Sequence, residues 1–218
     1  MDACARLVGG SAAAPAKVTG ASRTDAGVHA LRQVASLSLD AELAPDALRR
    51  ALNALLPAAV RVTDARPAPA GFDARRSALG KRYLYVIDRG RTADPFLRRH
   101  AWHLPRPLDD GAMAGGLRHV LGKHDFSAFC RKGPEGSSLT RRVYDSRWVD
   151  EGEGALRYEI RANAFCWQMV RAVVGTLVEV GIGKRRPGEI MGVLRTGERR
   201  GAGQLAPPRG LCLWDVGY

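Results

Sequence analysis

The stretch KRYLYVI, residues 81–87, determines the class of fold. In a β-strand successive side chains point to opposite faces, so Tyr83, Tyr85 and Ile87 share one face and Arg82, Leu84 and Val86 share the other. The same period of two recurs over residues 156–161. Both stretches therefore predict half-buried strands of a sheet.

Further elements are predicted on both sides of these two strands. Four more strands are expected, at residues 18–19, 35–39, 60–62 and 211–216. Three helices are expected, from Pro45 up to Pro57, over residues 110–121 and over residues 166–180. The last helix is apolar nearly all round, which predicts that it is buried.

These elements interleave, form hairpin-like pairs and lack the glycine-rich nucleotide fingerprints of a parallel sheet. We therefore expect an α+β fold with a largely antiparallel sheet. A proline-rich stretch precedes the strand at residues 81–87, and we place a domain boundary there. The boundary gives an N-terminal half, residues 1–78, and a C-terminal half, residues 79–218. A basic loop is expected over residues 131–142.

The chain is strongly basic. Its 34 Lys and Arg residues outnumber 22 Asp and Glu, which gives a formal net charge of +12. This excess favours a polyanionic partner, although drift toward arginine in a GC-rich genome is the alternative. The sequence has neither an apolar stretch long enough for a membrane helix nor a signal pattern after Met1, which predicts a cytoplasmic protein with no membrane partner.

The four cysteines predict neither a metal site nor a redox pair. Cys4, Cys130, Cys166 and Cys212 are far apart in sequence and form no C-x-x-C pair. No histidine stands at zinc-ligand spacing from any of them. We expect reduced, mostly buried thiols and no bound metal.

Asp25 is the first candidate for catalysis. It lies in GASRTDAG, residues 20–27, a stretch of small and turn-forming residues directly after the expected strand, with Arg23 two residues away. Reactive groups usually lie on loops held by a rigid scaffold. The alternative is an Asx-turn, in which Asp25 binds its own backbone and Gly27 supplies a positive φ.

Arg171 is the second candidate, because it lies inside the most hydrophobic helix that the sequence predicts. A buried guanidinium requires an anionic partner, since an unpaired buried charge costs several kcal/mol. Asp25 is one such partner. Alternatively, Arg171 extends to the surface or pairs with Glu179, two turns further along the helix.

Tyr83 is the third candidate. It follows a group of cations, of which Arg75, Lys81 and Arg82 are candidate substrate-binding residues. Aromatic rings interleaved with cations are typical of nucleic-acid sites, where the rings stack on bases and the cations contact phosphates. Plain core packing of the tyrosines on the strand is the alternative.

Three segments resemble the tRNA pseudouridine synthase A family. The first is GASRTDAGVHA, residues 20–30, and the second combines FDAR, residues 72–75, with KRYLY, residues 81–85. The third combines NAF, residues 163–165, with MVR, residues 169–171. Their order and approximate spacing match the family over nearly the whole chain, and the first motif is specific to it.

The resemblance implies a pseudouridine synthase fold, with two ferredoxin-like halves and a central cleft. It implies isomerisation of uridine to pseudouridine at positions 38, 39 and 40 of the anticodon stem-loop of tRNA, by a homodimer without cofactor or metal. In that reading Asp25 is the nucleophile, Tyr83 stacks on the target uracil and Arg171 pairs with Asp25. Arg23 resembles the residue that fills the gap left by the flipped base.

The chemistry agrees with these roles. The reaction breaks the bond from C1′ to N1, rotates the uracil and joins C1′ to C5, so the nucleotide must leave the helical stack. A carboxylate promotes this by attacking the base, by attacking the sugar or by assisting deprotonation of the ribose. The sequence leaves the three routes open.

The family begins earlier than this chain. The resemblance starts only after an opening strand and most of a first helix, on the order of 25 to 30 residues at typical element lengths. We therefore expect those elements to be missing before Met1. A catalytically impaired tRNA-binding or RNA-folding protein of the same fold is the resulting alternative, and a structural protein without an RNA partner is a third.

Overall fold

The computed structural model describes residues 17–39, 43–131 and 136–218, and these form two compact units. One unit comprises the described residues up to Ser22 together with Val34–Ser77, and the other comprises Arg23–Gln33 together with Ala78–Tyr218. The chain passes from the first unit to the second for the last time between residues 77 and 78. The domain boundary expected from the sequence lies one residue later, between residues 78 and 79. The loop that carries Asp25, however, belongs to the second unit and not to an N-terminal half.

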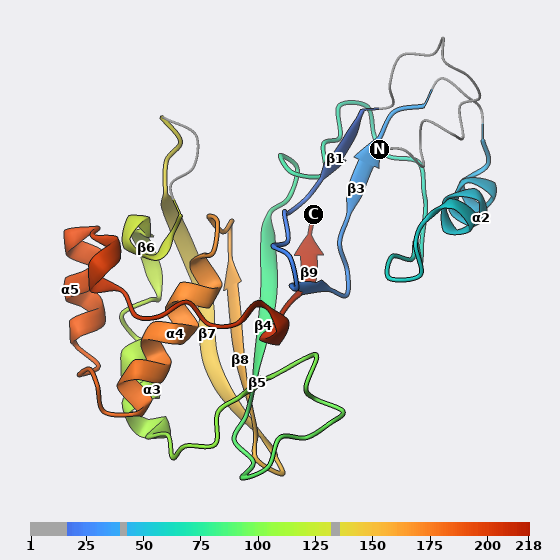
Figure 1. Ribbon diagram of the computed structural model, residues 1–218. Coiled ribbons are helices and arrows are strands. Elements are labelled where there is room, and N and C mark those ends of the chain that lie inside the picture. Colours follow the sequence, from blue (N-terminus) through green and yellow to red (C-terminus); the bar gives the residue numbers. More distant parts are fainter. Residues whose placement is uncertain (1–16, 40–42, 132–135) are drawn as a thin grey trace. The chain divides into compact units, whose positions relative to one another are not determined.

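In its described residues, 17–22, 34–39 and 43–77, the first unit contains a two-stranded sheet and one helix (Figure 1). Strand β1 (Val18–Gly20) pairs antiparallel with β3 (Ala35–Leu37). Helix α2 (Pro45–Leu55) begins with a proline, whose fixed φ suits the first helical turn, and ends before Pro57, which disfavours a helical residue ahead of it. The helix predicted between the two prolines is confirmed.

The strand predicted at residues 60–62 is wrong. Asn53, on α2, donates from Nδ2 to the carbonyl of Val62, and its Oδ1 accepts from the amide of Val62, both at 2.8 Å. One side-chain amide thus occupies both backbone groups through which a neighbouring strand would pair. Val60 is 48% exposed, so the apolar pattern here has no covered face.

The second unit is built on a seven-stranded sheet in the order β2-β9-β4-β8-β7-β6, with β5 beside β4 (Figure 1). The strands are β2 (His29–Ala30), β4 (Gly80–Asp88), β5 (Trp102–His103), β6 (Gly122–Asp125), β7 (Thr140–Gly152), β8 (Ala155–Ala162) and β9 (Leu211–Gly217). Within the described residues, only β2 with β9 and β4 with β5 pair in parallel. The expected α+β class with a largely antiparallel sheet is confirmed.

The face of β4 that carries Tyr83, Tyr85 and Ile87 lies in the core of this unit. Tyr83 lies opposite Ile160 and Tyr85 opposite Tyr158, and all four are at most 5% exposed. Three helices complete the unit: α3 (Asp110–Leu117), α4 (Met169–Gly181) and α5 (Glu189–Thr196). Helix α4 is buried on nearly all sides, as predicted.

Some element boundaries differ from the expectation for local reasons. Helix α4 begins at Met169, three residues late, because Gln168 has a left-handed backbone with φ of 67°. Strand β7 begins at Thr140, inside the stretch expected to be a basic loop, and residues 132–135 of that stretch lie outside the described part. No helix among the described residues is both long and apolar enough to cross a bilayer.

Candidate active site

Asp25 lies in a turn whose backbone leaves the carboxylate free for other partners. The main-chain carbonyl of Asp25 accepts a hydrogen bond from the amide of Val28 at 3.0 Å, and Gly27 has φ of 81°. A Cβ atom added to Gly27 would lie 3.2 Å from Cγ of Pro208, so the turn runs close to the segment before β9. The positive φ of Gly27 is therefore present, but the main-chain carbonyl of Asp25 closes the turn and its carboxylate does not, so this is not the Asx-turn weighed as the alternative.

Two side chains hold the two oxygens of the Asp25 carboxylate. Arg171 donates from Nη1 to Oδ2 at 2.9 Å, and Trp167 donates from Nε1 to Oδ1 at 2.5 Å. The side chains of Asp25 and Arg171 are 21% and 11% exposed. Hydrogen bonds to an ionised group are the stronger kind, so this carboxylate is sheltered, oriented and balanced by a neighbouring positive charge.

Arg171 is itself fixed by a second contact. Its Nε donates to the carbonyl of Ala206 at 2.8 Å, so the planar guanidinium is held along two edges. The pairing with Asp25 that we expected is present. The alternative pairing with Glu179 is not what the structure shows, because Glu179 forms an ion pair with Arg185.

Trp167 is the residue that sequence reasoning missed. It lies four residues before Arg171, but it precedes Met169, the first residue of α4, so helical spacing does not explain its place beside Asp25 and the sequence carried no signal for this contact. Arg131 lies over its indole, with Cζ 4.3 Å from the ring centroid, and the amide of Arg131 donates to the carbonyl of Trp167 at 2.9 Å. The indole that binds Asp25 is thus held from its other side as well.

The expectation of reduced cysteines is wrong for one pair. Cys130 and Cys166 form a disulfide between the two residues that precede Arg131 and Trp167. Their separation of 36 residues hides this in the sequence, because only folding brings the two segments together. Cys212 is a free thiol whose pKa is raised by burial, and Cys4 lies outside the described residues.

Tyr83 lies against the segment that supplies the partners of Asp25. Its ring, 5% exposed, meets that of Phe165 edge-on, with centroids 4.9 Å apart. On the same face of β4, Tyr85 donates its hydroxyl to the carbonyl of Pro207 at 2.8 Å. Burial raises the pKa of Tyr85 far above its usual range, so this phenol remains a neutral donor.

The other candidates lie in different surroundings. Arg23 is exposed on the loop two residues before Asp25, and Lys81 is buried on β4. Arg82 donates to the buried carboxylate of Glu159 at 2.7 Å, so it already has a structural partner. Arg75 belongs to the first unit, where its amide donates to the carboxylate of Asp73.

A family model and several known proteins each match most of this chain. The family model described as tRNA pseudouridine synthase matches residues 4–75 and 117–218, which include Asp25 and Arg171 but not Tyr83. The tRNA pseudouridine synthase A of Leifsonia xyli subsp. xyli (strain CTCB07) is 44% identical, over 94% of this chain and 77% of the relative. The protein of the same name from Exiguobacterium sibiricum is 38% identical, over 94% of this chain and 81% of the relative. This chain therefore belongs to the tRNA pseudouridine synthase family.

Proposed function

We propose that this protein isomerises uridine to pseudouridine in tRNA, at positions 38, 39 and 40 of the anticodon stem-loop. The observation that carries the proposal is the carboxylate of Asp25, bound on one oxygen by Arg171 and on the other by Trp167. Relatives named tRNA pseudouridine synthase A support the choice of reaction and substrate.

The reaction rearranges one nucleotide. The bond from C1′ to N1 breaks, the uracil turns, C1′ bonds to C5, and the proton lost from C5 is balanced by a proton gained at N1. No electrons enter or leave, so the reaction needs no redox cofactor. Asp25 promotes the rearrangement either as a nucleophile toward the base or sugar or as a base toward the ribose, and its fixed orientation favours each of these roles.

The remaining roles follow the same proposal. Tyr83 stacks on the target uracil, and its edge contact with Phe165 supports a fixed ring plane. Arg23 fills the gap left by the flipped base, and Arg75, Lys81 and Arg82 contribute positive charge toward tRNA phosphates. The net charge of +12 supports a polyanionic substrate. The impaired alternative is not favoured, because Asp25, Arg171 and Trp167 are assembled in the described residues.

We further propose a cytoplasmic homodimer. The support is the family, since tRNA is a cytoplasmic substrate and the resemblance implies a dimer. Sedimentation equilibrium tests the dimer: the expected mass is twice the 23.5 kDa of one chain. A mass of one chain at micromolar concentration would contradict it.

The function is tested by mapping pseudouridine with a carbodiimide reagent in unmodified tRNA after incubation with the protein. Reverse-transcription stops are expected at uridines 38, 39 and 40. A tRNA with cytidine at these positions is the control and should show no stops there. Absence of stops in the anticodon stem-loop of the uridine-containing tRNA would overturn the proposal.

A further inference from the structure

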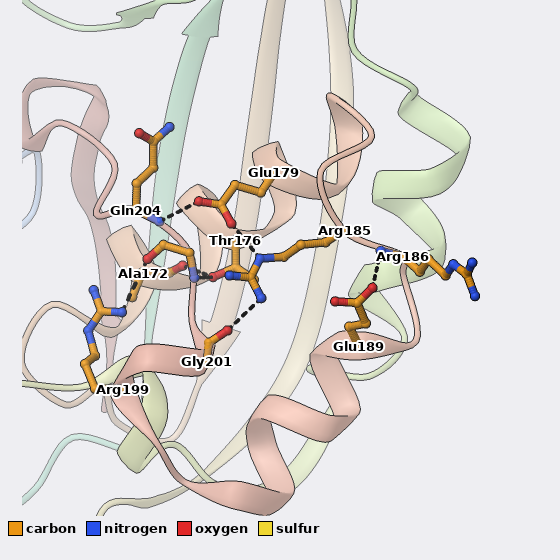
Figure 2. Close-up of polar contacts among 10 residues, drawn as sticks. Ala172, Thr176, Glu179, Arg185, Arg186, Glu189, Arg199, Gly201 and Gln204 are labelled. Carbon is orange, nitrogen blue, oxygen red and sulfur yellow. Dashed lines mark hydrogen bonds and ion pairs between the residues drawn. The ribbon is translucent and has the colours of Figure 1, made fainter.

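A segment without regular secondary structure beyond its first residue, residues 201–207 and here called the strap, starts at the end of the 3-10 helix Arg199–Gly201. It runs beside α4 and is held there by polar side chains (Figure 2). Glu179 accepts from the amide of Gln204 on Oε1 at 2.9 Å, and from Nε of Arg185 on Oε2 at 2.5 Å. Arg185 also donates to the carbonyl of Gly201 at 2.7 Å. Both oxygens of this carboxylate therefore serve to hold the strap.

Thr176 adds a second attachment one turn earlier on α4. Its hydroxyl donates to the carbonyl of Ala172 at 2.7 Å and accepts from the amide of Gly203 at 2.9 Å (Figure 2). Thr176 is 1% exposed and Glu179 15%. The two hydrogen bonds of Thr176 are thus shielded from water, where they hold geometry best, whereas the bond from the amide of Gln204 to Glu179 lies at the surface.

The strap lies directly on the helix backbone. A Cβ atom added to Gly175 would lie 1.8 Å from the carbonyl oxygen of Gln204, which is far inside van der Waals contact. One added to Gly203 would lie 2.9 Å from Cα of Thr176. Two glycines therefore allow a close approach with no space for the strap to shift toward the helix.

The far end of the strap holds the arginine of the active site. The carbonyl of Ala206 accepts from Nε of Arg171 at 2.8 Å, and the amide of Ala206 donates to the carbonyl of Arg171 at 3.2 Å. The next carbonyl, of Pro207, accepts from the hydroxyl of Tyr85. The position of the Ala206 carbonyl consequently decides where the guanidinium lies, and with it the Nη1 atom that binds Asp25.

We propose that Glu179 is a positioning residue for the isomerisation, acting on Asp25 through the strap and Arg171. Glu179 lies eight residues after Arg171, about 12 Å along the helix at 1.5 Å per residue, so it acts through the strap and not by contact. The inference rests on the proposed function for its kinetic consequences, whereas the attachment of the strap is independent of it.

Substitutions at Glu179 should give a graded effect. Glu179→Gln keeps one acceptor for the amide of Gln204 but turns a donor toward Arg185, and Glu179→Ala loses both contacts. A displacement of about 1 Å at a reacting group costs up to roughly a hundredfold in rate. We expect the single-turnover rate of pseudouridine formation to fall about tenfold or more in Glu179→Ala and by less in Glu179→Gln, with tRNA affinity within about threefold of wild type.

A double-mutant cycle with Arg171→Lys separates positioning from general destabilisation. If Glu179 acts through Arg171, Glu179→Gln should slow Arg171→Lys far less than it slows the wild type. Equal factors in the two backgrounds, or a loss confined to tRNA affinity, would overturn the proposal. Glu189→Ala is the matched control, because Glu189 binds the amide of Arg186 at 3.0 Å on α5, and it should leave the rate unchanged.

Hydrogen exchange gives a readout that needs no activity. The amides of Gly203 and Gln204 should exchange faster in Glu179→Ala, which loses the acceptor of the Gln204 amide, than in the wild type, with the amides within α4 unchanged. If the strap amides exchange in the variant at the wild-type rate, Glu179 does not hold the strap, and this conclusion stands even where the wild type isomerises tRNA. An inactive wild type would instead reject the proposed function and leave the attachment to be decided by exchange.

Discussion

The indole nitrogen of Trp167 lies 2.5 Å from Oδ1 of Asp25, the carboxylate oxygen that Arg171 does not bind. Both donors come from residues 167–171, at the start of the most buried helix of the second unit. Asp25 belongs to the same unit, on a loop more than a hundred residues earlier in the sequence. One short segment therefore sets the orientation of the proposed nucleophile.

Trp167→Phe removes this donor and keeps an aromatic ring beneath Arg131. A hydrogen bond to a charged group contributes about 1.5 to 3 kcal/mol. If that contact orients Asp25 in the transition state, the single-turnover rate of isomerisation should fall by about tenfold to a hundredfold, with tRNA affinity little changed.

Trp148→Phe is the control for the loss of an indole. Nε1 of Trp148 is buried and has no hydrogen-bond partner among the residues that the structure describes. The substitution should leave the rate unchanged, even where packing against Tyr158 weakens. Equal losses of rate in the two variants would show that the bond from Trp167 to Asp25 does not matter for the reaction.

Gly175→Ala should loosen the strap and destabilise the protein. The added methyl group would overlap the carbonyl oxygen of Gln204, so the backbone must shift, and overpacking of this kind typically costs about 1 to 3 kcal/mol. Urea unfolding measures the free energy, and the isomerisation rate should fall with it because Arg171 depends on the strap.

Gly192→Ala makes the same change at an open position. Gly192 lies within α5, and an added Cβ would meet nothing within 4 Å. Alanine is the better helix former by about 0.5 to 1 kcal/mol, so this variant should be more stable than the wild type. Destabilisation at Gly192 comparable with that at Gly175 would contradict the close approach of the strap.

Acid should destabilise the second unit through Glu159. This carboxylate is 2% exposed and lies between Arg82, Arg147 and Arg157. Burial raises the pKa of Glu159, but the hydrogen bonds from Arg82 and Arg147, together with the charges of these arginines, lower it by more. The pKa therefore lies below the ordinary 4.5. The unfolded chain therefore takes up the proton first, and the stability that the carboxylate provides above pH 4.5 is lost as pH falls toward its folded pKa.

Urea unfolding across this range tests the assignment. Glu159→Gln should be less stable than the wild type at pH 7 by about 1.5 to 3 kcal/mol, since charge-assisted hydrogen bonds are lost while Arg147 and Arg157 keep ion pairs with Asp145 and Glu151. The difference should shrink as the pH falls below 4.5. A constant difference down to acid pH would contradict a lowered pKa of Glu159.

The elements with a pattern of their own were predictable. The alternation at residues 81–87 and 156–161 gave β4 and β8 because each strand has one buried face, and the apolar run gave α4. The two-residue strands β2 and β5 carry no such pattern. The prediction of a strand at residues 60–62 failed because the side chain of Asn53, and not a neighbouring strand, binds the backbone of Val62.

The candidate site was predictable only where charge required a partner. A buried arginine inside an apolar helix requires an anionic partner, and Asp25 is the partner of Arg171. The hydrogen bond from Trp167, the disulfide of Cys130 with Cys166 and the strap depend on tertiary approach between segments distant in sequence. A neutral indole or thiol creates no unpaired charge, so the sequence gives no energetic reason to seek its partner.

The role of Asp25 is tested most directly by release of tritium from tRNA carrying tritium at C5 of its uridines, because joining C1′ to C5 requires loss of that atom. The wild type should release tritium from the anticodon stem-loop. Asp25→Asn keeps the shape of the side chain, and it should release none above the background without enzyme while binding tRNA within roughly tenfold of the wild-type affinity. Release by Asp25→Asn at a rate near that of the wild type would contradict the assignment of Asp25 as the catalytic carboxylate.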